Sequence, residues 1–271
     1  YKGKVVVWWH SDIVKQKKLM KLYKPFMDSF LSRADVIITA TQGHIDGSDY
    51  LLKHKNKCVI IPYGIDKRIE KNSDLYIEKS KQLRGSLKPV QMLFVGRLVY
   101  YKGCDILIEA FKKVDNAELT IIGEGELKKV IEEKVRQYNM TEKVHLIGKV
   151  KEEEICKAYE DCDVLVLPST EKSEAFGLVQ IEAMTFGKPV INTNLSSGVP
   201  YVSLDGVTGL TVPPNDVQAL ADAMKWMVEH DKERNEMGRR ARNRVKECFR
   251  MDDMLDKVLK IYNYQEKGES I

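Results

Sequence analysis

The chain has 271 residues, of which 43% are hydrophobic and 31% are charged. This balance allows one large domain or two smaller ones, with real cores and a well-solvated surface. The longest apolar runs are strand-sized, which excludes a membrane-spanning helix, and the net charge of +4 is modest. The basic residues lack interleaved exposed aromatics, which argues against a nucleic-acid partner. Five cysteines without a C-x-x-C pair predict reduced thiols.

Residues 1–70 predict a small and incomplete α/β unit. Short apolar runs predict strands at 4–9, 35–40 and 58–61, and a longer pattern predicts a helix at about 13–32. So few strands would leave an unpaired edge and one uncovered apolar face. We therefore expect this unit to be the less complete part of the protein.

The predicted first helix contains a lysine-rich segment, residues 15–24, with five lysines beside apolar residues. One interpretation is an interfacial helix that binds anionic lipid. The other, which we favour, is a surface helix whose lysines stay in water while its apolar stripe packs on the sheet. The stripe consists of Leu19, Tyr23, Phe26 and Phe30.

A charged stretch at 71–88 predicts a linker to a second domain at 89–248. That domain opens with an apolar strand that is followed by Gly96, Arg97 and Lys102. Arginine and lysine at the carboxyl end of a strand can hold phosphate oxygens. An ordinary strand–helix turn with exposed cations is the alternative interpretation.

Two further segments resemble known binding motifs but are weak evidence for a dinucleotide site or a metal site. The segment LTIIGEGE (119–126) resembles the start of a dinucleotide fingerprint, but Lys128 stands where the third glycine would be. It predicts a tight turn and argues against a dehydrogenase. The string Asp161-Cys162-Asp163 has the D-x-D form of a metal site, but it leads into a strand. We expect Asp163 to border that strand and assign no metal.

Residues 163–189 read as strand, loop and helix, with two glutamates eight positions apart. Gly177 opens the helical pattern, and Gly187-Lys188-Pro189 ends it. Glu174 in the loop and Glu182 in the helix suit a ligand with hydroxyl groups at both ends and an anionic middle over the helix N-terminus. A nucleotide-sugar has that shape. Two solvated surface charges are the alternative interpretation.

Strands alternate with helices from residue 90 to 230, which predicts a parallel sheet covered by helices on both faces. Right-handed crossovers would place the loops at the strand ends along one edge. The separate motifs would then form one site.

The motifs GRL-x3-KG, IIGEGE, VHLIGKV, DVLVLPS, E-x7-E, GKPVINTN and DGVTGLTVPP occur in that order. This set resembles the C-terminal half of the retaining glycosyltransferases of family 4 over about residues 90–247. Segments 5–12 and 59–66 resemble the back part of the family's N-terminal domain. The resemblance implies a GT-B fold with two Rossmann-like lobes, the first incomplete and the second complete. It also implies a final helix, 249–271, that returns to the first lobe.

The resemblance implies a donor site in the second lobe and a catalytic residue in the first. Arg97 and Lys102 would bind the donor diphosphate and Glu182 the ribose, while Lys149 and Val150 would contact the base. The donor sugar and phosphates would lie among Glu174, Ala175, Phe176, Gly177 and Leu178. His10 would lie near the reacting sugar, so His10 and Glu174 are the catalytic candidates. Ala175 departs from the glycine that is frequent in the family.

The function that the resemblance implies is the retaining transfer of a hexose, mannose in particular, to a hydroxyl of a glycan or lipid-linked glycan in cell-surface polysaccharide synthesis. GDP-mannose is the expected donor, with a UDP-hexose next, and no cofactor is required. We expect a cytoplasmic location with peripheral contact to the inner face of an anionic membrane. Because the first lobe is incomplete, weak turnover is expected. The alternative is a non-catalytic module that binds a nucleotide or nucleotide-sugar.

Overall fold

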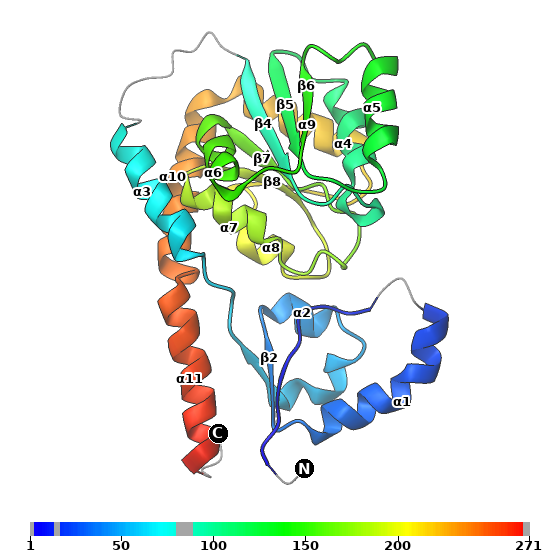
Figure 1. Cartoon of the computed structure of the whole chain (residues 1–271), viewed down its shortest axis with the longest axis vertical. Coiled ribbons are helices and arrows are strands. Elements are labelled where there is room, and N and C mark those ends of the chain that lie inside the picture. The colour runs from blue at the N-terminus through cyan, green and yellow to red at the C-terminus, as the bar shows by residue number, and fades with distance from the viewer. Residues whose placement is uncertain (1–2, 14–16, 80–88, 268–271) are drawn as a thin grey trace.

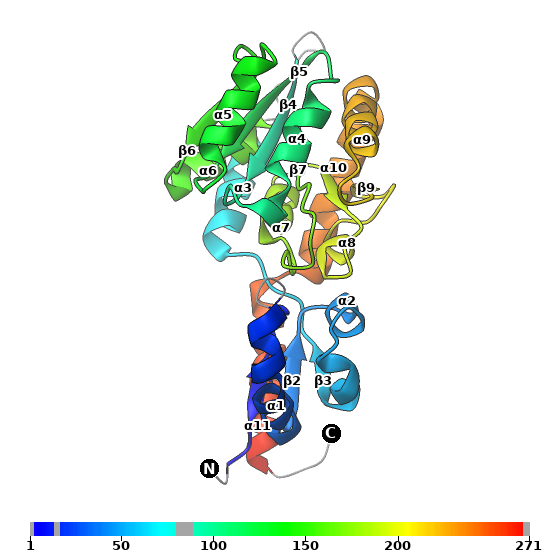
Figure 2. The same ribbon diagram turned by 90° about the vertical axis from the view of Figure 1, so that its right-hand side faces the viewer.

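The computed structural model describes residues 3–13, 17–79 and 89–267, which form a small and a large α/β lobe (Figure 1). The sheet of the small lobe has strand order β1-β2-β3, and that of the large lobe has order β6-β5-β4-β7-β8-β9. All strand pairs within both sheets are parallel. Figure 2 shows the two lobes one above the other, with α11 running beside the small one.

The elements of the small lobe come from both ends of the chain. They are β1 (Val6–Trp8), α1 (Lys17–Arg33), β2 (Val36–Thr39), α2 (Gln42–Asp46), the 3-10 helix η1 (Leu51–Lys57), β3 (Cys58–Ile60) and α11 (Met251–Lys267).

The elements of the large lobe alternate between strand and helix. They are α3 (Lys67–Lys79), β4 (Val90–Val95), the 3-10 helix η2 (Tyr100–Lys102), α4 (Cys104–Phe111), β5 (Ala117–Ile122), α5 (Lys128–Gln137), β6 (Val144–Gly148), α6 (Glu152–Asp161), β7 (Val164–Val166), α7 (Leu178–Thr185), β8 (Val190–Thr193), α8 (Val199–Val202), β9 (Gly209–Val212), α9 (Val217–Glu229) and α10 (Asp231–Cys248).

The large sheet is packed on both faces, as predicted. Successive side chains of a strand point to opposite faces, so Met92 and Phe94 of β4 join the core under α4, α5 and α9. Leu93 and Val95 join the second core, under α6, α7 and α10. Parallel strands buried on both faces need continuous apolar runs, which explains the sequence of β7 and most of that of β4, whereas β5 carries the half-buried Glu118 and Thr120 on one face.

The small sheet is also packed on both faces, so the expected uncovered face is absent from the described residues. Val7 and Trp9 pack with Leu31 of α1 on one side. On the other side, Ile38 and its neighbours pack against Ile261 of α11. The helix from the end of the chain therefore supplies the layer that residues 1–70 lack.

The predicted packing of the stripe on α1 is wrong for the three stripe residues whose side chains the structure describes. Tyr23, Phe26 and Phe30 are 50%, 71% and 52% exposed, whereas Leu31 on the inner side is fully buried. Apolar residues are spaced for packing on two sides of the helix, and it is the side with Met27 and Leu31 that packs in the core. The side chain of Leu19 lies outside the described part.

The predicted linker begins later than expected, because residues 71–79 belong to α3. Ile69 of α3 joins the core of the large lobe, and Arg242 of α10 forms an ion pair with Asp74 at 2.6 Å. The segment is so polar that its sequence predicts no buried side. Its helix contacts α6 and α10 largely through polar side chains. The remainder of the predicted linker, 80–88, lies outside the described residues.

Candidate active site

The strands β4 to β7 end at one edge of the large sheet, and the loops beyond them touch one another. Gly123, after β5, has φ of 147°, and a Cβ atom there would collide with the carbonyl oxygen of Gly96 after β4. Glycine is the residue that allows this conformation and this close approach. The motif IIGEGE thus serves a close contact between two loops at the sheet edge.

Lys102 and Glu174, two predicted site residues on different loops, meet in this region. The ammonium nitrogen of Lys102 lies 2.5 Å from Oε2 of Glu174, and the two side chains are only 12% and 9% exposed. Ser169 donates a hydrogen bond to the same carboxylate oxygen at 3.0 Å. Burying two charges costs free energy unless they are paired and hydrogen-bonded, so this arrangement holds both side chains in one geometry.

The loop that follows Glu174 leads into α7, whose N-terminus faces the same edge. Gly177 precedes α7 with φ of 72°, a conformation that favours glycine. Phe176 is buried, Ala175 accepts a hydrogen bond from the backbone of Gly198 at 2.7 Å, and Leu178 is exposed. The backbone N–H groups at a helix start favour an anion, so this loop suits a phosphate.

Glu182 lies further along α7 and is held by a residue that the sequence did not point to. Tyr159 of α6, which is fully buried, donates a hydrogen bond to Oε2 of Glu182 at 2.7 Å. Burial raises the pKa of the Glu182 carboxyl above its ordinary value, and the bond from Tyr159 opposes the increase. The nearby Glu182 adds to the effect of burial in raising the pKa of Tyr159. Tyr159 could not be singled out, because it occupies an apolar position in an ordinary helix.

Arg97 and Lys149 are the exposed cations of the predicted set. Arg97 donates to the hydroxyl of Tyr101 at 2.9 Å, which keeps its guanidinium beside the loop that carries Lys102. Lys149 and Val150 follow β6, and Val150 is half-buried. These residues share the sheet edge with Lys102 and Glu174, but among the described residues no hydrogen bond or ion pair joins their side chains to that pair.

His10 extends from the end of β1 in the small lobe and contacts Tyr63. Its Nδ1 atom lies 2.5 Å from the Tyr63 hydroxyl, and the Tyr63 ring packs edge-on against Phe176 with centroids 5.0 Å apart. His10 is itself exposed. Tyr63 therefore connects the catalytic candidate of the small lobe to the loop that contains Glu174 and Gly177.

A second contact, between Lys172 and Asp12, joins the two lobes. Lys172, two residues before Glu174, lies 3.1 Å from Asp12 and donates to the carbonyl of Gly47 at 2.8 Å. Asp12 also accepts hydrogen bonds from Ser48 and from the indole of Trp9. The separation of Asp12 and Lys172 along the chain is 160 residues, so no local pattern could reveal the pair.

His44 lies beside this contact. Burial lowers the pKa of His44 to about 4, so its ring is neutral at ordinary pH. A Cβ atom at Gly198 would lie 2.6 Å from the His44 ring, which shows how closely the two lobes approach here.

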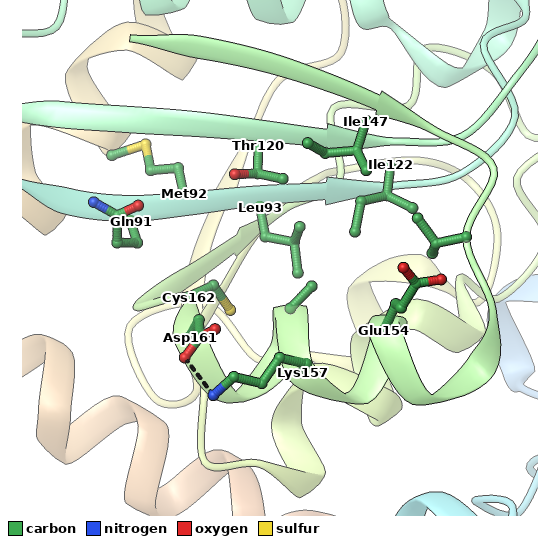
Figure 3. A pocket seen from close by; sticks show the side chains of 12 residues that line it. Gln91, Met92, Leu93, Thr120, Ile122, Ile147, Glu154, Lys157, Asp161 and Cys162 are labelled. Atoms are coloured by element: carbon green, nitrogen blue, oxygen red, sulfur yellow. Dashed lines mark hydrogen bonds and ion pairs between the residues drawn. The ribbon is translucent and has the colours of Figure 1, made fainter.

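A cavity of about 260 Å3 lies under β4, β5 and β6 beside α6 (Figure 3). Ile122 and Ile147 line one end and Gln91 and Cys162 the other (Figure 3), and Val150, which follows β6, also lines the cavity. Lys157 and Asp161 on its rim form an ion pair at 3.0 Å. Asp163 accepts from the backbone of Gln91, which agrees with its predicted place beside a strand. The paired or backbone-bound charges around this cavity argue against a catalytic centre there.

The fold defines the class of protein. The structure superposes on Alr3699/HepE of Anabaena, solved in complex with UDP, with a TM-score of 0.81 and 18% identity over 96% of this chain and 72% of that one. It matches sucrose-phosphate synthase of Thermosynechococcus elongatus with a TM-score of 0.81 and 23% identity over 97% of this chain and 68% of that one. The predicted GT-B architecture is therefore confirmed.

Sequence comparison supplies the family. The chain belongs to the family of glycosyl transferases group 1, whose model matches residues 76–244. It is 32% identical to O-antigen chain mannosyltransferase C of Escherichia coli, over 96% of this chain and 69% of that protein. It is 36% identical to D-rhamnosyltransferase WbpZ of Pseudomonas aeruginosa, over 90% of this chain and 63% of that protein. The predicted family is confirmed, and a purely non-catalytic binding module is not favoured. In the part of the chain that the structure describes, every helix is too short or too polar to cross a bilayer.

Proposed function

We propose that this chain supplies the donor-binding lobe and part of the acceptor-side lobe of a retaining hexosyltransferase. The observation that carries the proposal is the buried pair of Lys102 and Glu174 at the strand-end edge, beside the start of α7. An ammonium has three N–H donors, so Lys102 can hold Glu174 and a phosphate oxygen together. Glu174 remains able to accept a hydrogen bond from a sugar hydroxyl.

In the proposed reaction, the bond between the sugar and the phosphate breaks while the acceptor oxygen bonds to the same sugar carbon from the same face. The acceptor proton passes to the departing phosphate oxygen. Arg97, Lys102 and the N-terminus of α7 stabilise the growing negative charge, which reduces the need for a metal ion. His10 orients the sugar or the acceptor, and closure of the lobes excludes water.

The donor that we propose is GDP-mannose, with a UDP-hexose next, and the acceptor is a hydroxyl of a glycan or lipid-linked glycan. The mannosyl- and rhamnosyltransferase relatives support a hexose of this type, while structural neighbours were solved with UDP and with UDP-glucose. No cofactor enters the proposal. We place the enzyme in the cytoplasm.

Isothermal titration with GDP, UDP and NAD tests the donor site. We expect binding of GDP, weaker binding of UDP and none of NAD, and we expect Lys102→Ala to weaken GDP binding at least about tenfold. Lys157→Ala, which removes a surface cation of α6, is the matched control and should bind GDP normally. Binding of NAD alone, or equal GDP binding by both variants, would contradict the proposal.

The outward side of α1 supports a peripheral contact with anionic membrane. Leu22, Tyr23 and Phe26 are exposed on this helix, which also carries part of the lysine-rich segment 15–24. Apolar side chains beside lysines favour binding at a negatively charged lipid surface. Co-sedimentation with phosphatidylserine vesicles should be reduced by Phe26→Ser and unaffected by Leu259→Ser, which changes an exposed residue of α11. Lack of co-sedimentation at moderate salt would remove the membrane proposal.

A further inference from the structure

Three nearly parallel aromatic rings, those of Trp8, His10 and Tyr63, cluster at the end of the small sheet that faces the large lobe. Trp8 is the last residue of β1 and His10 lies two residues further along, and their rings stack with centroids 5.7 Å apart and planes 13° apart. The rings of Trp8 and Tyr63 are tilted by 3° and those of His10 and Tyr63 by 10°, with centroids 6.2 Å and 5.9 Å apart. The layer therefore holds the imidazole of His10 in one plane.

A hydrogen bond joins Tyr63 and His10, and the tautomer of the imidazole decides which of the two donates. Burial raises the pKa of Tyr63 to about 12, so the phenol keeps its proton at ordinary pH. The Tyr63 hydroxyl can then donate to Nδ1 of His10, 2.5 Å away. A neutral imidazole has one N–H, and if Nδ1 accepts, that proton is on Nε2.

Tyr63 also contacts the large lobe. Its ring meets Phe176 edge-on at 81°, and Phe176 meets Phe249 in the same manner. Phe176 is 3% exposed and lies between Glu174 and Gly177, so its backbone is part of the candidate donor site. A movement of Tyr63 would therefore change the position of His10 relative to that loop.

We propose that Tyr63 is a positioning residue, which donates to Nδ1 of His10, holds the tautomer that carries its proton on Nε2, and sets the imidazole over the Phe176 loop. The inference rests on the proposed function, because His10 has a role in transfer only if the site binds a sugar donor. In this tautomer, Nε2 is a hydrogen-bond donor. His10 then binds an oxygen of the donor or acceptor, and it does not remove the proton of the acceptor hydroxyl.

Nitrogen NMR of the histidine side chains tests the tautomer without any need for activity. In the wild-type chain labelled with 15N, the His10 signals, assigned by their loss in His10→Gln, should show a protonated Nε2 and an unprotonated Nδ1. In Tyr63→Phe, which keeps the ring and removes the hydroxyl, the signals should shift toward a mixture of tautomers. Tyr138→Phe, which removes a hydroxyl bonded to Glu109 in the large lobe, should leave the His10 signals unchanged. A wild-type His10 protonated on Nδ1 would overturn the proposal.

Steady-state kinetics test the consequence for transfer. Tyr63→Phe should lower kcat about tenfold, the value expected for one hydrogen bond, and should change KM for the sugar donor less than about twofold. Tyr138→Phe should match the wild type. An unchanged kcat in Tyr63→Phe would overturn the positioning role. If the wild type transferred no sugar but kept the expected His10 tautomer, the proposed function would fail while the Tyr63–His10 bond stood.

Discussion

The two lobes hold their candidate functional side chains in different ways. In the large lobe, Lys102, Glu174 and Glu182 are buried or half-buried and are paired with neighbours from other loops or helices. In the small lobe, His10 is exposed, and its ring is held by a hydrogen bond with Tyr63 and by stacking on Trp8. The large lobe thus presents a preformed binding edge, whereas the small lobe presents a single exposed group whose partner, Tyr63, packs on Phe176 of the large lobe.

The cause lies in how each sheet is built. The large lobe has a six-stranded sheet whose central strands are buried on both faces, and its candidate side chains are held by partners on neighbouring loops and helices. The small lobe has three strands and takes one of its covering helices, α11, from the far end of the chain. Binding should therefore be a property of the large lobe, and catalysis should require the two lobes together.

The largest effect is expected from Lys102→Ala, because it leaves the Glu174 carboxylate buried without its cation. Breaking a buried pair in this way costs about 3–5 kcal/mol of unfolding free energy, and turnover should fall about 100-fold to 1000-fold. Urea unfolding and kcat/KM for the donor measure the two effects. Adding Glu174→Gln should restore much of the stability but not the turnover. A loss of stability no larger than that of the exposed pair variant Lys157→Ala would show that the binding edge is not preformed.

Arg97→Ala should separate binding from stability in the large lobe. Arg97 is exposed, so the unfolding free energy should change by less than about 0.5 kcal/mol. Loss of one charge-assisted contact to the leaving phosphate should cost about 2–4 kcal/mol of transition-state stabilisation, by analogy with a lost oxyanion donor. Arg136→Ala, at an exposed position of α5, is the control for loss of charge. Near-normal turnover in Arg97→Ala would defeat its assignment to the diphosphate.

Lys172→Ala tests the contact between the lobes. It removes the ion pair with Asp12, while Asp12 keeps its bonds from Ser48 and Trp9, so the chain should fold normally. Turnover should fall about tenfold, and donor affinity, measured by calorimetry, should stay within about twofold of the wild type. The exposed Lys129→Ala on α5 is the matched control. If donor affinity fell as much as turnover, the inference that the large lobe alone binds the donor would be wrong.

The raised pKa of Glu182 predicts how donor binding depends on pH. In the proposed donor site its carboxyl accepts the ribose hydroxyls, more strongly when it is ionised, and burial raises its pKa above the ordinary 4.5. Affinity should therefore be full above the raised pKa and should decline as the pH falls through it, at a higher pH than for an exposed glutamate. Calorimetry with GDP across mildly acidic pH measures this decline, of several-fold at most over the first pH unit. Glu182→Gln should bind more weakly at neutral pH and lack the decline.

The smallest effect is expected on the outer side of α1. Phe26 is 71% exposed, so Phe26→Ser should change the unfolding free energy by less than about 0.5 kcal/mol. Leu31→Ala, in the same helix but fully buried, should cost about 2–5 kcal/mol. Thermal and urea unfolding compare the two variants directly. Equal costs would mean that the outer side of α1 is packed in solution.

The sequence by itself determined the local elements and their order. Apolar strand runs, the glycine at Gly177 and the alternation of strand and helix predicted a parallel sheet with its loops on one edge. Since parallel strands bring their carboxyl ends together, that was enough to place Lys102 and Glu174 in one site. It was not enough for α3, whose polar composition hides its contacts, or for the side of α1 that packs.

Only the tertiary structure decided which side chains meet across long separations. The pairing of Tyr63 with His10, of Tyr159 with Glu182 and of Lys172 with Asp12 joins segments from different elements or lobes. No periodicity connects such positions, because each pair depends on how whole layers are stacked rather than on the local conformation of the chain. These contacts fix the orientation of the candidate groups, whereas the sequence alone indicates only which groups are present.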